Sequence, residues 1–421
     1  MRRYGLPGNV CRVALRLDGG LDTDLLRERV AASPILNWLA RVRIVRSLPL
    51  LPPRWHAAAG PKTFFHEHNG AAANGAEPGT LPPAVAERDL RADEGPALAL
   101  DLVRHADGTR HLVYSWNHAL MDARGAELML RHLNAGQEVK DPPTVENLIN
   151  PAQKVWNLSK WWNSVKLARG SMEWLRKSGS EPVFTLMQSL RPAGPCRGQC
   201  RLLSFSEEET ARMDARCQSL NAGFRRSNFY LASSIRALHA VAQGRGNKDE
   251  AYLVPVPHDM RRRGANGPIF SNQLSILFYR IEPRQAGTLS EIIAEVTRQM
   301  MDQIRDRFPE ACMAALDMFK PMPLDYYVRH LGQPTRGKFA SLCFSDSGET
   351  CAGMSQLLGG RIQEVTHLVP TWRPPGLTIL FWSFKGRPRV LLSWVDDCLS
   401  PAEVNILEEG LRAALLEESV A

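Results

Sequence analysis

The chain has 421 residues, of which 44% are hydrophobic and 23% are charged, and this globular composition excludes a disordered protein and a small disulfide scaffold. This length is too great for one ordinary core, so we expect two domains of roughly 200 residues each. The net charge of +8 favours acidic partners, but Lys and Arg form no long block, and no motif supports a nucleic-acid partner.

The cysteines and the apolar segments bear on the cell compartment. The eight cysteines lack the regular spacing of a secreted disulfide framework. Cys196 and Cys200 have no second pair or histidine nearby to complete a zinc site, so we expect no metal. The N-terminus has no apolar stretch long enough for a signal peptide, and no window approaches the ~18 apolar residues of a transmembrane helix. We therefore expect reduced thiols and a cytoplasmic location.

In the first half, strand-like and helix-like patterns alternate up to about residue 135. Expected strands are 10–17, 40–45, 97–105 and 111–116, and expected helices are 22–32 and 123–134. The Ala-, Gly-, Asn- and Pro-rich segment 57–83 is expected to be a long surface loop. Asp107-Gly108 between two apolar runs is a strong hairpin signal. The hairpin leads into the stretch Trp116 to Gly125, which lies between a strand and a helix.

Residues 154–177 combine four tryptophans with Lys and Arg on a helical pattern. Such a helix can lie in a membrane interface, which would make the protein peripheral to a membrane. It can also pack its tryptophans over a domain junction, which we favour because interfacial helices rarely sit in mid-chain. The segment 178–199 is polar and rich in Pro and Gly, so we place the boundary there, with domains at 1–180 and 195–421.

The second half again mixes strands and helices. Expected strands are 200–205, 252–257, 340–344, 377–384 and 388–394, and 270–278 is expected to be a loop that enters a buried strand. Expected helices are 206–220, 229–243, 289–307 and a last helix from Ser400. Ser206 with Glu209 and Ser400 with Glu403 form capping boxes that begin two of these helices. Strands and helices in both halves predict an α/β or α+β fold with two domains of similar size.

His118 and Asp122 stand four residues apart at the strand-to-helix junction. In the structural interpretation, Asp122 directly precedes a helical run and is no more than its N-cap. His118, in contrast, emerges at the end of an apolar strand. A neutral imidazole there can remove a proton from an alcohol or amine that attacks a thioester. The pair therefore favours a general base with a carboxylate that fixes the local geometry.

Other catalytic motifs are missing. The sequence has no G-x-S-x-G elbow, which leaves a serine hydrolase unsupported. It has no G-x-x-x-x-G-K-[ST] loop and no H-E-x-x-H pair, so an NTPase and a zinc protease are unsupported as well.

Several segments together resemble the superfamily of condensation domains and CoA-dependent acyltransferases. This group includes chloramphenicol acetyltransferase, the condensation domains of nonribosomal peptide synthetases and the wax ester synthases. The family motif HHxxxDG matches Asn117 to Ala123. Further similar segments, in the same order along both halves, are 17–22, 32–36, 95–98, 254–257, 271–275 and 391–416.

The resemblance implies a fold and an activity. Two chloramphenicol acetyltransferase-like subdomains, each a mixed sheet with flanking helices, are expected to form a V-shaped cleft crossed by a channel. The implied enzyme is an acyltransferase that moves a group other than an amino-acyl group. A CoA or acyl carrier protein thioester would be the donor, and a hydroxyl or amine of a small molecule the acceptor. We expect no bound cofactor besides this co-substrate, a carrier protein as a further partner, and a monomer.

The resemblance also implies roles for residues. His118 corresponds to the family's general base, and Asp122 to a mainly architectural Asp that pairs with an Arg. Arg41, Arg43 and Arg261 are the candidates for that Arg, and the sequence does not choose between them. The candidate substrate-binding residues are Asn117, Gly125, Asn272 and Ser275.

The chain departs from the family pattern at two motif positions. Asn117 stands where the family has its first His, and Ala123 where it has a Gly. The DFGWG element of the plant BAHD acyltransferases is absent, and so are carrier-protein and adenylation segments, so we expect a stand-alone unit outside that branch. The departures keep open an alternative, a catalytically silent relative that binds a lipid or a carrier protein in the same cleft. The presence of both His118 and Asp122 favours the enzyme.

Overall fold

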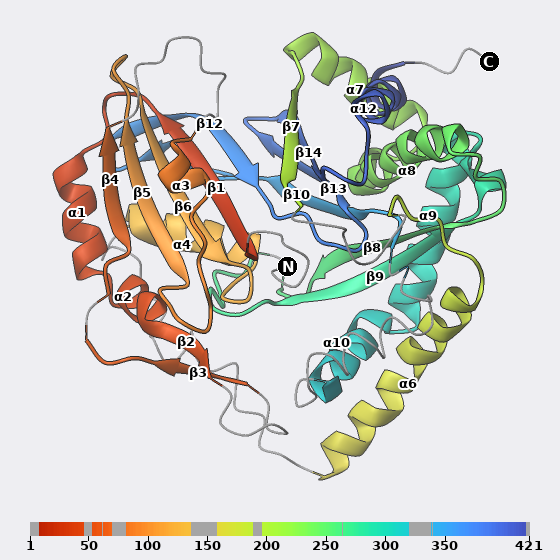
Figure 1. Cartoon of the computed structure of the whole chain (residues 1–421), viewed down its shortest axis with the longest axis horizontal. Coiled ribbons are helices and arrows are strands. Elements are labelled where there is room, and N and C mark those ends of the chain that lie inside the picture. The colour runs from red at the N-terminus through yellow and green to blue at the C-terminus, as the bar shows by residue number, and fades with distance from the viewer. Residues whose placement is uncertain are drawn as a thin grey trace.

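The computed structural model describes residues 8–45, 53–60, 62–69, 81–135, 158–187, 196–262, 264–319, 338 and 340–417. These residues form two lobes, each with its own sheet and its own helices (Figure 1). The predicted α/β architecture with two subdomains is therefore confirmed.

The first lobe is built on a six-stranded sheet in the order β11-β12-β1-β6-β5-β4. Its strands are β1 Val10–Leu17, β4 Phe65–Asn69, β5 Leu98–Arg104, β6 Arg110–Asn117, β11 Gln356–Leu357 and β12 Gly360–Leu368. Its helices are α1 Thr23–Ala32, α2 Pro34–Arg41, α3 Pro83–Ala86 and α4 Ala123–Ala135. Residues of α1, α2 and α4 share one apolar core with the sheet, and α3 packs on the sheet's other face. Because both faces are covered, β5 and β6 are buried along almost their whole length.

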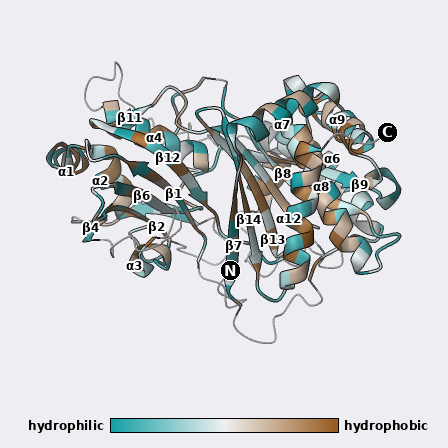
Figure 2. Ribbon diagram, turned by 90° about the horizontal axis from the view of Figure 1, so that it is seen from above, coloured by the Kyte–Doolittle hydropathy of each residue, from teal (hydrophilic) through white to brown (hydrophobic). Residues whose placement is uncertain are grey.

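The second lobe is built on a four-stranded sheet in the order β10-β13-β14-β7. Its strands are β7 Gly198–Ser204, β10 Cys343–Glu349, β13 Leu377–Phe384 and β14 Arg387–Val395. Its main helices are α7 Glu207–Ser219, α8 Arg226–Gly244, α9 Leu289–Arg305 and α12 Pro401–Leu416. Hydrophobic residues of these elements meet in a second core between the helices and the strands (Figure 2). The capping boxes predicted at Ser206 and Ser400 are both present, which confirms where α7 and α12 begin.

Two antiparallel hairpins and two further helices complete the described part. One hairpin pairs β2 Val42–Val45 with β3 Arg54–Ala57, and the other pairs β8 Tyr252–Asp259 with β9 Leu274–Ile281. The two helices are α6 Leu158–Ser180 and α10 Phe308–Phe319. Short 3₁₀ helices lie at Gly223–Arg225 and Pro283–Ala286. The long β8–β9 hairpin runs from the second lobe toward the first (Figure 1). The segment that joins its strands therefore lies where the two lobes meet.

β11 and β12 belong to the second half of the sequence but lie in the sheet of the first lobe. β12 pairs with β1 in antiparallel register from Arg12↔Leu368 to Leu17↔Ile362, so residues from the second half complete the first sheet. The division at 1–180 and 195–421 stays a prediction, and the segment 356–368 does not follow it in space. The chain then returns to the second sheet through residues 369–376, the segment between β12 and β13.

Some predicted element bounds are wrong. Segment 57–83 was expected to be a loop, but it contains β4, an edge strand that pairs in parallel with β5; residues 61 and 70–80 lie outside the described residues. Ser33 ends α1 as expected, yet it also caps α2, which continues where a strand was expected to begin. Both errors arise where tertiary pairing or a local cap decides the structure of a segment with weak periodicity.

The Trp-rich helix packs part of its length inward. Trp174 of α6 lies beside Phe278 of β9 and Phe308 of α10, with ring centroids 5.6 Å and 5.4 Å apart. Trp162 on the same helix is 52% exposed, and residues 154–157 lie outside the described residues. None of the described helices is long and apolar enough to span a membrane. Peripheral contact through this stretch stays a prediction.

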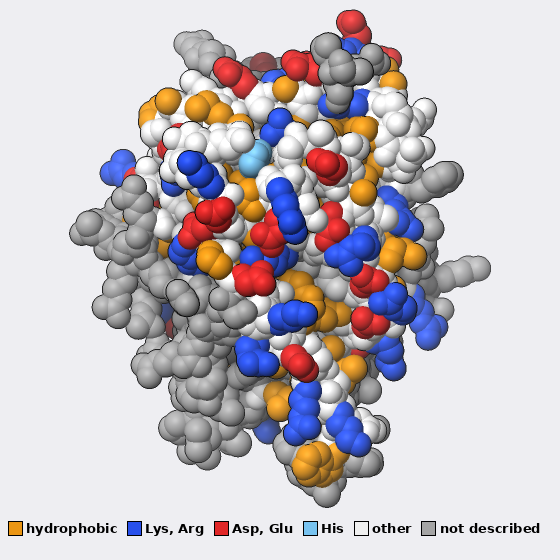
Figure 3. All heavy atoms as spheres, turned by 90° about the vertical axis from the view of Figure 1, so that its right-hand side faces the viewer, with side chains coloured by type: hydrophobic (Ala, Val, Ile, Leu, Met, Phe, Trp, Pro, Cys, Tyr) orange, Lys and Arg blue, Asp and Glu red, His pale blue; other side chains and the backbone are white. Residues whose placement is uncertain are grey.

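The surface charge is mixed on the face at the right of Figure 1. Lys and Arg side chains alternate there with Asp and Glu, and hydrophobic side chains lie between them (Figure 3). Elsewhere among the charged side chains, Arg298 on α9 forms ion pairs with Glu295 and with Asp302. On this face, then, the net positive charge does not gather into a single basic field.

A buried histidine in β12 predicts acid sensitivity. His367 is 5% exposed, its Nε2 lies 3.0 Å from Oγ1 of Thr350, and burial lowers its pKa to about 4. An unfolded histidine titrates near ~6.5, so the unfolded state binds the proton more tightly. The contribution of neutral His367 to the free energy of unfolding is therefore complete above the pKa of the unfolded histidine, and it is lost as the pH falls toward 4. Urea unfolding should show a loss of roughly 2 kcal/mol from this residue between pH 7 and pH 5.

The matched control is His367→Gln, which keeps a hydrogen-bonding group opposite Thr350 but does not titrate. Its free energy of unfolding should depend less on pH than that of the wild type. Equal pH dependence in the two proteins would contradict the assignment.

Candidate functional site

The motif turn begins where β6 ends. The backbone N–H of Asn117 donates to the carbonyl of Ala97 at 2.8 Å, and that of His118 donates to Asn9 at 2.7 Å. These bonds extend the β5–β6 and β1–β6 pairings to the last residues of β6. The next residues turn away, and α4 begins at Ala123. The hairpin predicted from Asp107-Gly108 thus delivers a partly exposed His118 to the end of the sheet.

Asn117 holds the turn in shape. Its side chain is buried, Nδ2 donates to the carbonyl of Leu90 at 2.8 Å, and Oδ1 accepts from the backbone N–H of Ala119 at 3.0 Å. An amide can donate and accept at once, which suits both bonds. The departure from the family's first His therefore has a structural role in this chain. Its predicted role in substrate binding stays a prediction.

Asp122 has three hydrogen-bond donors around its carboxylate. Oδ1 accepts from the backbone N–H of Gly125 at 2.8 Å and from Nη2 of Arg261 at 3.0 Å, and Oδ2 accepts from the backbone N–H of Gln273 at 2.8 Å. The side chains of Asp122 and Arg261 are only 1% and 3% exposed. Asp122 is thus both the N-cap of α4 and one half of a buried ion pair between the lobes.

The Arg that pairs with Asp122 is Arg261, which settles the choice left open among three arginines. Arg261 lies just after β8 and also donates to the carbonyl of Pro268, at 3.2 Å from Nε and 3.1 Å from Nη2. Arg41 instead donates from Nε to the carbonyl of Asn37 within its own helix. The guanidinium of Arg261 thereby fixes the segment between β8 and β9 against the motif turn.

Residues 269–273 lie directly along the motif turn. Nδ2 of Asn272 donates to the backbone carbonyl of His118 at 2.8 Å, and the N–H of Ser271 donates to that of Leu120 at 2.8 Å. Ser271 and Met121 form an isolated parallel bridge. The structure therefore brings Asn272 to the backbone of His118, and its predicted role in substrate binding stays a prediction. Oδ1 of Asn272 is buried and has no hydrogen-bond partner within the described part of the chain.

Gly125 lies against the same segment. A Cβ on Gly125 would be 2.4 Å from the carbonyl oxygen of Ile269, so no side chain fits there. Ser275 is fully buried at the start of β9, and its Oγ donates to the carbonyl of Pro309 at 2.6 Å, which ties β9 to α10. Gly125 and Ser275 thus hold parts of the structure together near the site, and substrate contact by either stays a prediction.

Gly125→Ala should destabilise the protein because Ile269 presents backbone that cannot move aside without shifting the inter-lobe segment. We expect a loss of about 1–3 kcal/mol in the free energy of unfolding, measured by urea titration. Gly170→Ala in α6 is the control, since its Cβ would meet nothing within 4 Å. Alanine there should raise stability by up to about 1 kcal/mol. Similar effects at the two positions would contradict the close contact.

Trp372 is a site residue that sequence reasoning missed. Its ring centroid lies 6.2 Å from that of His118 in an edge-to-face arrangement. It comes from residues 369–376, between β12 and β13, where the sequence shows a lone Trp among prolines. Within the described part of the chain, neither imidazole nitrogen of His118 has a hydrogen-bond partner, so the ring stays available to a bound molecule.

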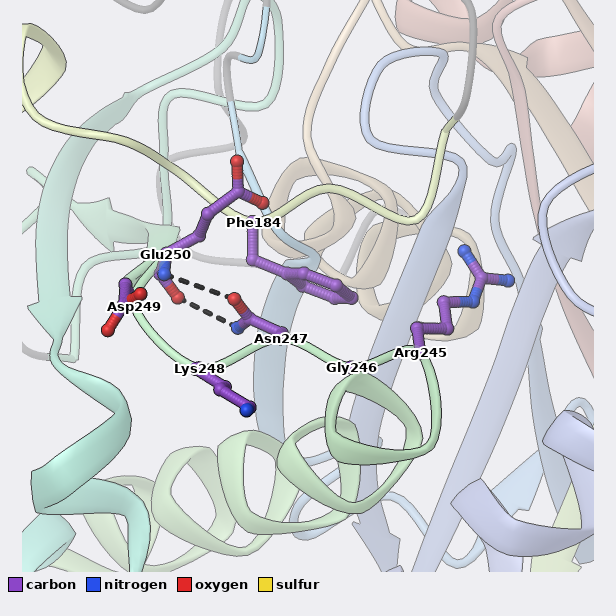
Figure 4. Close-up of a pocket in the computed structure, with 7 residues that line it drawn as sticks. All are labelled: Phe184, Arg245, Gly246, Asn247, Lys248, Asp249 and Glu250. Atoms are coloured by element: carbon purple, nitrogen blue, oxygen red, sulfur yellow. Dashed lines mark hydrogen bonds between the residues drawn. The ribbon is translucent and has the colours of Figure 1, made fainter.

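Two other features could be taken for sites. Cys196, Asp396 and Asp397 could together hold a metal ion, but Arg373 contacts the sulfur of Cys196 at 3.4 Å and pairs with Asp397, and its positive charge opposes a cation. A surface pocket of about 360 Å³ lies at the α8–β8 loop (Figure 4). In this pocket, Nδ2 of Asn247 donates to the backbone carbonyl of Glu250 at 2.9 Å, and Oδ1 of Asn247 accepts from the backbone N–H of Glu250 at 3.0 Å. Neither feature includes His118.

No protein-family model and no curated protein sequence matches this chain. Solved structures do resemble it over nearly its whole length. Trichothecene 15-O-acetyltransferase from Fusarium sporotrichioides has a TM-score of 0.69 at 13% identity, with 98% of this chain and 91% of that chain covered. The condensation domain of the monacolin K polyketide synthase has a TM-score of 0.67 at 12% identity, with 97% and 91% covered.

The first condensation domain of the calcium-dependent antibiotic synthetase is similar, with a TM-score of 0.66 at 15% identity and 99% and 92% covered. At such low identity the likeness establishes the fold. The chain therefore has the two-lobed fold of condensation domains and CoA-dependent acyltransferases, which the sequence resemblance predicted.

Proposed function

We propose that this chain, with the two-lobed fold just described, is an acyltransferase that uses His118 as its general base. The donor is a CoA or carrier-protein thioester, and the acceptor is a hydroxyl or an amine of a small molecule. The observation that carries the proposal is the environment of His118. Its backbone is held by Asn9 in the first lobe and by Asn272 in the second, whereas its imidazole nitrogens have no partner among the described residues.

The chemistry follows from that arrangement. The imidazole accepts the proton of the acceptor O–H or N–H while the oxygen or nitrogen attacks the thioester carbonyl carbon. The tetrahedral intermediate collapses, the carbon–sulfur bond breaks, and the imidazolium returns the proton to the leaving thiolate. The net reaction releases an ester or amide and a free thiol, and His118 ends as it began. No covalent enzyme intermediate is needed.

Asp122 supports this base indirectly. Among the described residues, its oxygens accept hydrogen bonds from Gly125, Arg261 and Gln273, and not from the imidazole. These bonds fix the position of the turn that bears His118, and positioning of a catalytic group contributes strongly to rate. Asp122 and Arg261 are therefore positioning residues in this proposal.

Free-thiol release tests the proposal. Acyl-CoA thioesters of increasing chain length and a matching acyl carrier protein are each incubated with a panel of alcohols and amines. Acceptor-dependent thiol release above hydrolysis supports transfer, and mass spectrometry of the ester or amide identifies the acceptor. The alternative is a catalytically silent protein that binds a lipid or a carrier protein, as the departures at Asn117 and Ala123 suggested. Binding of thioesters or lipids without turnover of any acceptor would favour this alternative.

A further inference from the structure

Trp372 is held out of the core by its two neighbours. Thr371 is 5% exposed and its hydroxyl pairs with that of Ser393 in β14, and Arg373 is 7% exposed and pairs with Asp397. Trp372 between them is 47% exposed. Its carbonyl accepts the N–H of Gly376 at 2.7 Å, which closes the turn. Anchors on both sides therefore present a large apolar side chain at the surface beside His118.

The indole of Trp372 is exposed next to the imidazole of His118. Trp is on average highly buried, and its large ring with a polar N–H makes it frequent at binding interfaces. The indole lies 6.2 Å from the imidazole, centroid to centroid. A molecule that hydrogen-bonds to the imidazole is therefore close enough to the indole to contact it.

We propose that Trp372 determines acceptor specificity, by packing against an apolar ring that the acceptor carries beside its attacking oxygen or nitrogen. This proposal rests on the proposed function, because it takes the molecule at the imidazole to be the acceptor. The acceptor class it names is alcohols and amines with an aromatic or alicyclic group beside the nucleophile. Aromatic pairs contribute favourable contact beyond simple burial, so such acceptors gain most.

The test compares acceptors that differ only in this group. With one thioester donor, kcat/KM is measured for benzyl alcohol and ethanol, and for benzylamine and ethylamine. Trp372→Ala should lower kcat/KM for the benzyl acceptors about tenfold, mainly through a higher KM, and leave the ethyl acceptors nearly unchanged. Trp372→Phe should retain most of the preference. Trp162→Ala is the control, since it removes a similarly exposed tryptophan from α6.

If Trp372→Ala lowers kcat/KM equally for benzyl and ethyl acceptors, the tryptophan has a structural role and the proposal is wrong. The proposal is also wrong if the variant keeps the wild-type preference for benzyl acceptors. If the wild type releases no thiol with any acceptor, the proposed function fails separately. Ligand-observed NMR titration with benzyl alcohol then decides the matter without turnover. Weaker binding to Trp372→Ala than to the wild type supports the indole contact, and equal binding rejects it.

Discussion

Replacing His118 with alanine is expected to lower acceptor-dependent thiol release by ~10²–10⁴-fold, the range that a positioned general base contributes. The loss should fall on kcat, with KM for the acceptor changing much less, because the proton is transferred in the transition state and not on binding. Stability should change little. The side chain of His118 is partly exposed, and the hydrogen bonds of this residue to Asn9 and Asn272 are made by its backbone.

Two controls separate base catalysis from a change in shape. His118→Gln keeps a polar side chain of similar reach but cannot accept and return a proton at neutral pH, so it should be nearly as slow as the alanine variant. His258→Ala removes another partly exposed histidine, near the end of β8, and should retain activity. Turnover that survives in both His118 variants would sink the general-base assignment while leaving the fold intact.

The second large effect is expected at the Asp122–Arg261 pair. Both side chains are nearly inaccessible to water, so removing Arg261 leaves the Asp122 carboxylate buried without an ion-pair partner. Arg261, in contrast, has a second ion pair, with Asp259 at 3.2 Å. Arg261→Met should cost about 3–5 kcal/mol in the free energy of unfolding, measured by urea titration. Asp122→Ala should cost less than Arg261→Met, because Arg261 keeps its ion pair with Asp259. The double variant should cost less than the sum of the two, because the penalty of an unpaired charge is then removed.

Activity should fall together with stability in these variants, since Asp122 fixes the turn that carries His118. Arg387→Met is the matched control: its partner Glu207 lies at 3.2 Å, but the side chains are 53% and 88% exposed, so its loss should change stability little. Additive costs in the double variant would show that the pair is not coupled. Full activity in a folded Asp122→Ala protein would show that the carboxylate does not position the base.

The local parts of the site could be predicted from sequence. Asp107-Gly108 indicated the hairpin, the apolar run up to Trp116 indicated its second strand, and the helical pattern from Ala123 indicated α4. These signals are short-range, because turn chemistry and side-chain periodicity act over a few residues. They placed His118 at a strand end and Asp122 at a helix cap, and the structure has both there.

The parts of the site that come from distant segments could not be predicted in the same way. Arg261 is 139 residues from Asp122, and three arginines were equally acceptable by residue type, so only the path of the β8–β9 hairpin chose among them. The entry of β12 into the first sheet depends on pairing with β1 more than 340 residues earlier in the chain, as in Arg12↔Leu368. That pairing also brings residues 369–376, and with them Trp372, to the motif.

By itself, then, the sequence determined the catalytic candidate, the elements that deliver it and, through a resemblance spread over both halves, the class of fold. The tertiary structure alone decided the partner of Asp122, the structural use of Asn117 and Gly125, and the indole beside His118. The physical reason is range. A cap or a hairpin is stabilised by bonds between near neighbours in the chain, whereas the buried Asp122–Arg261 pair and the contact of Trp372 with His118 exist only once distant segments are packed together.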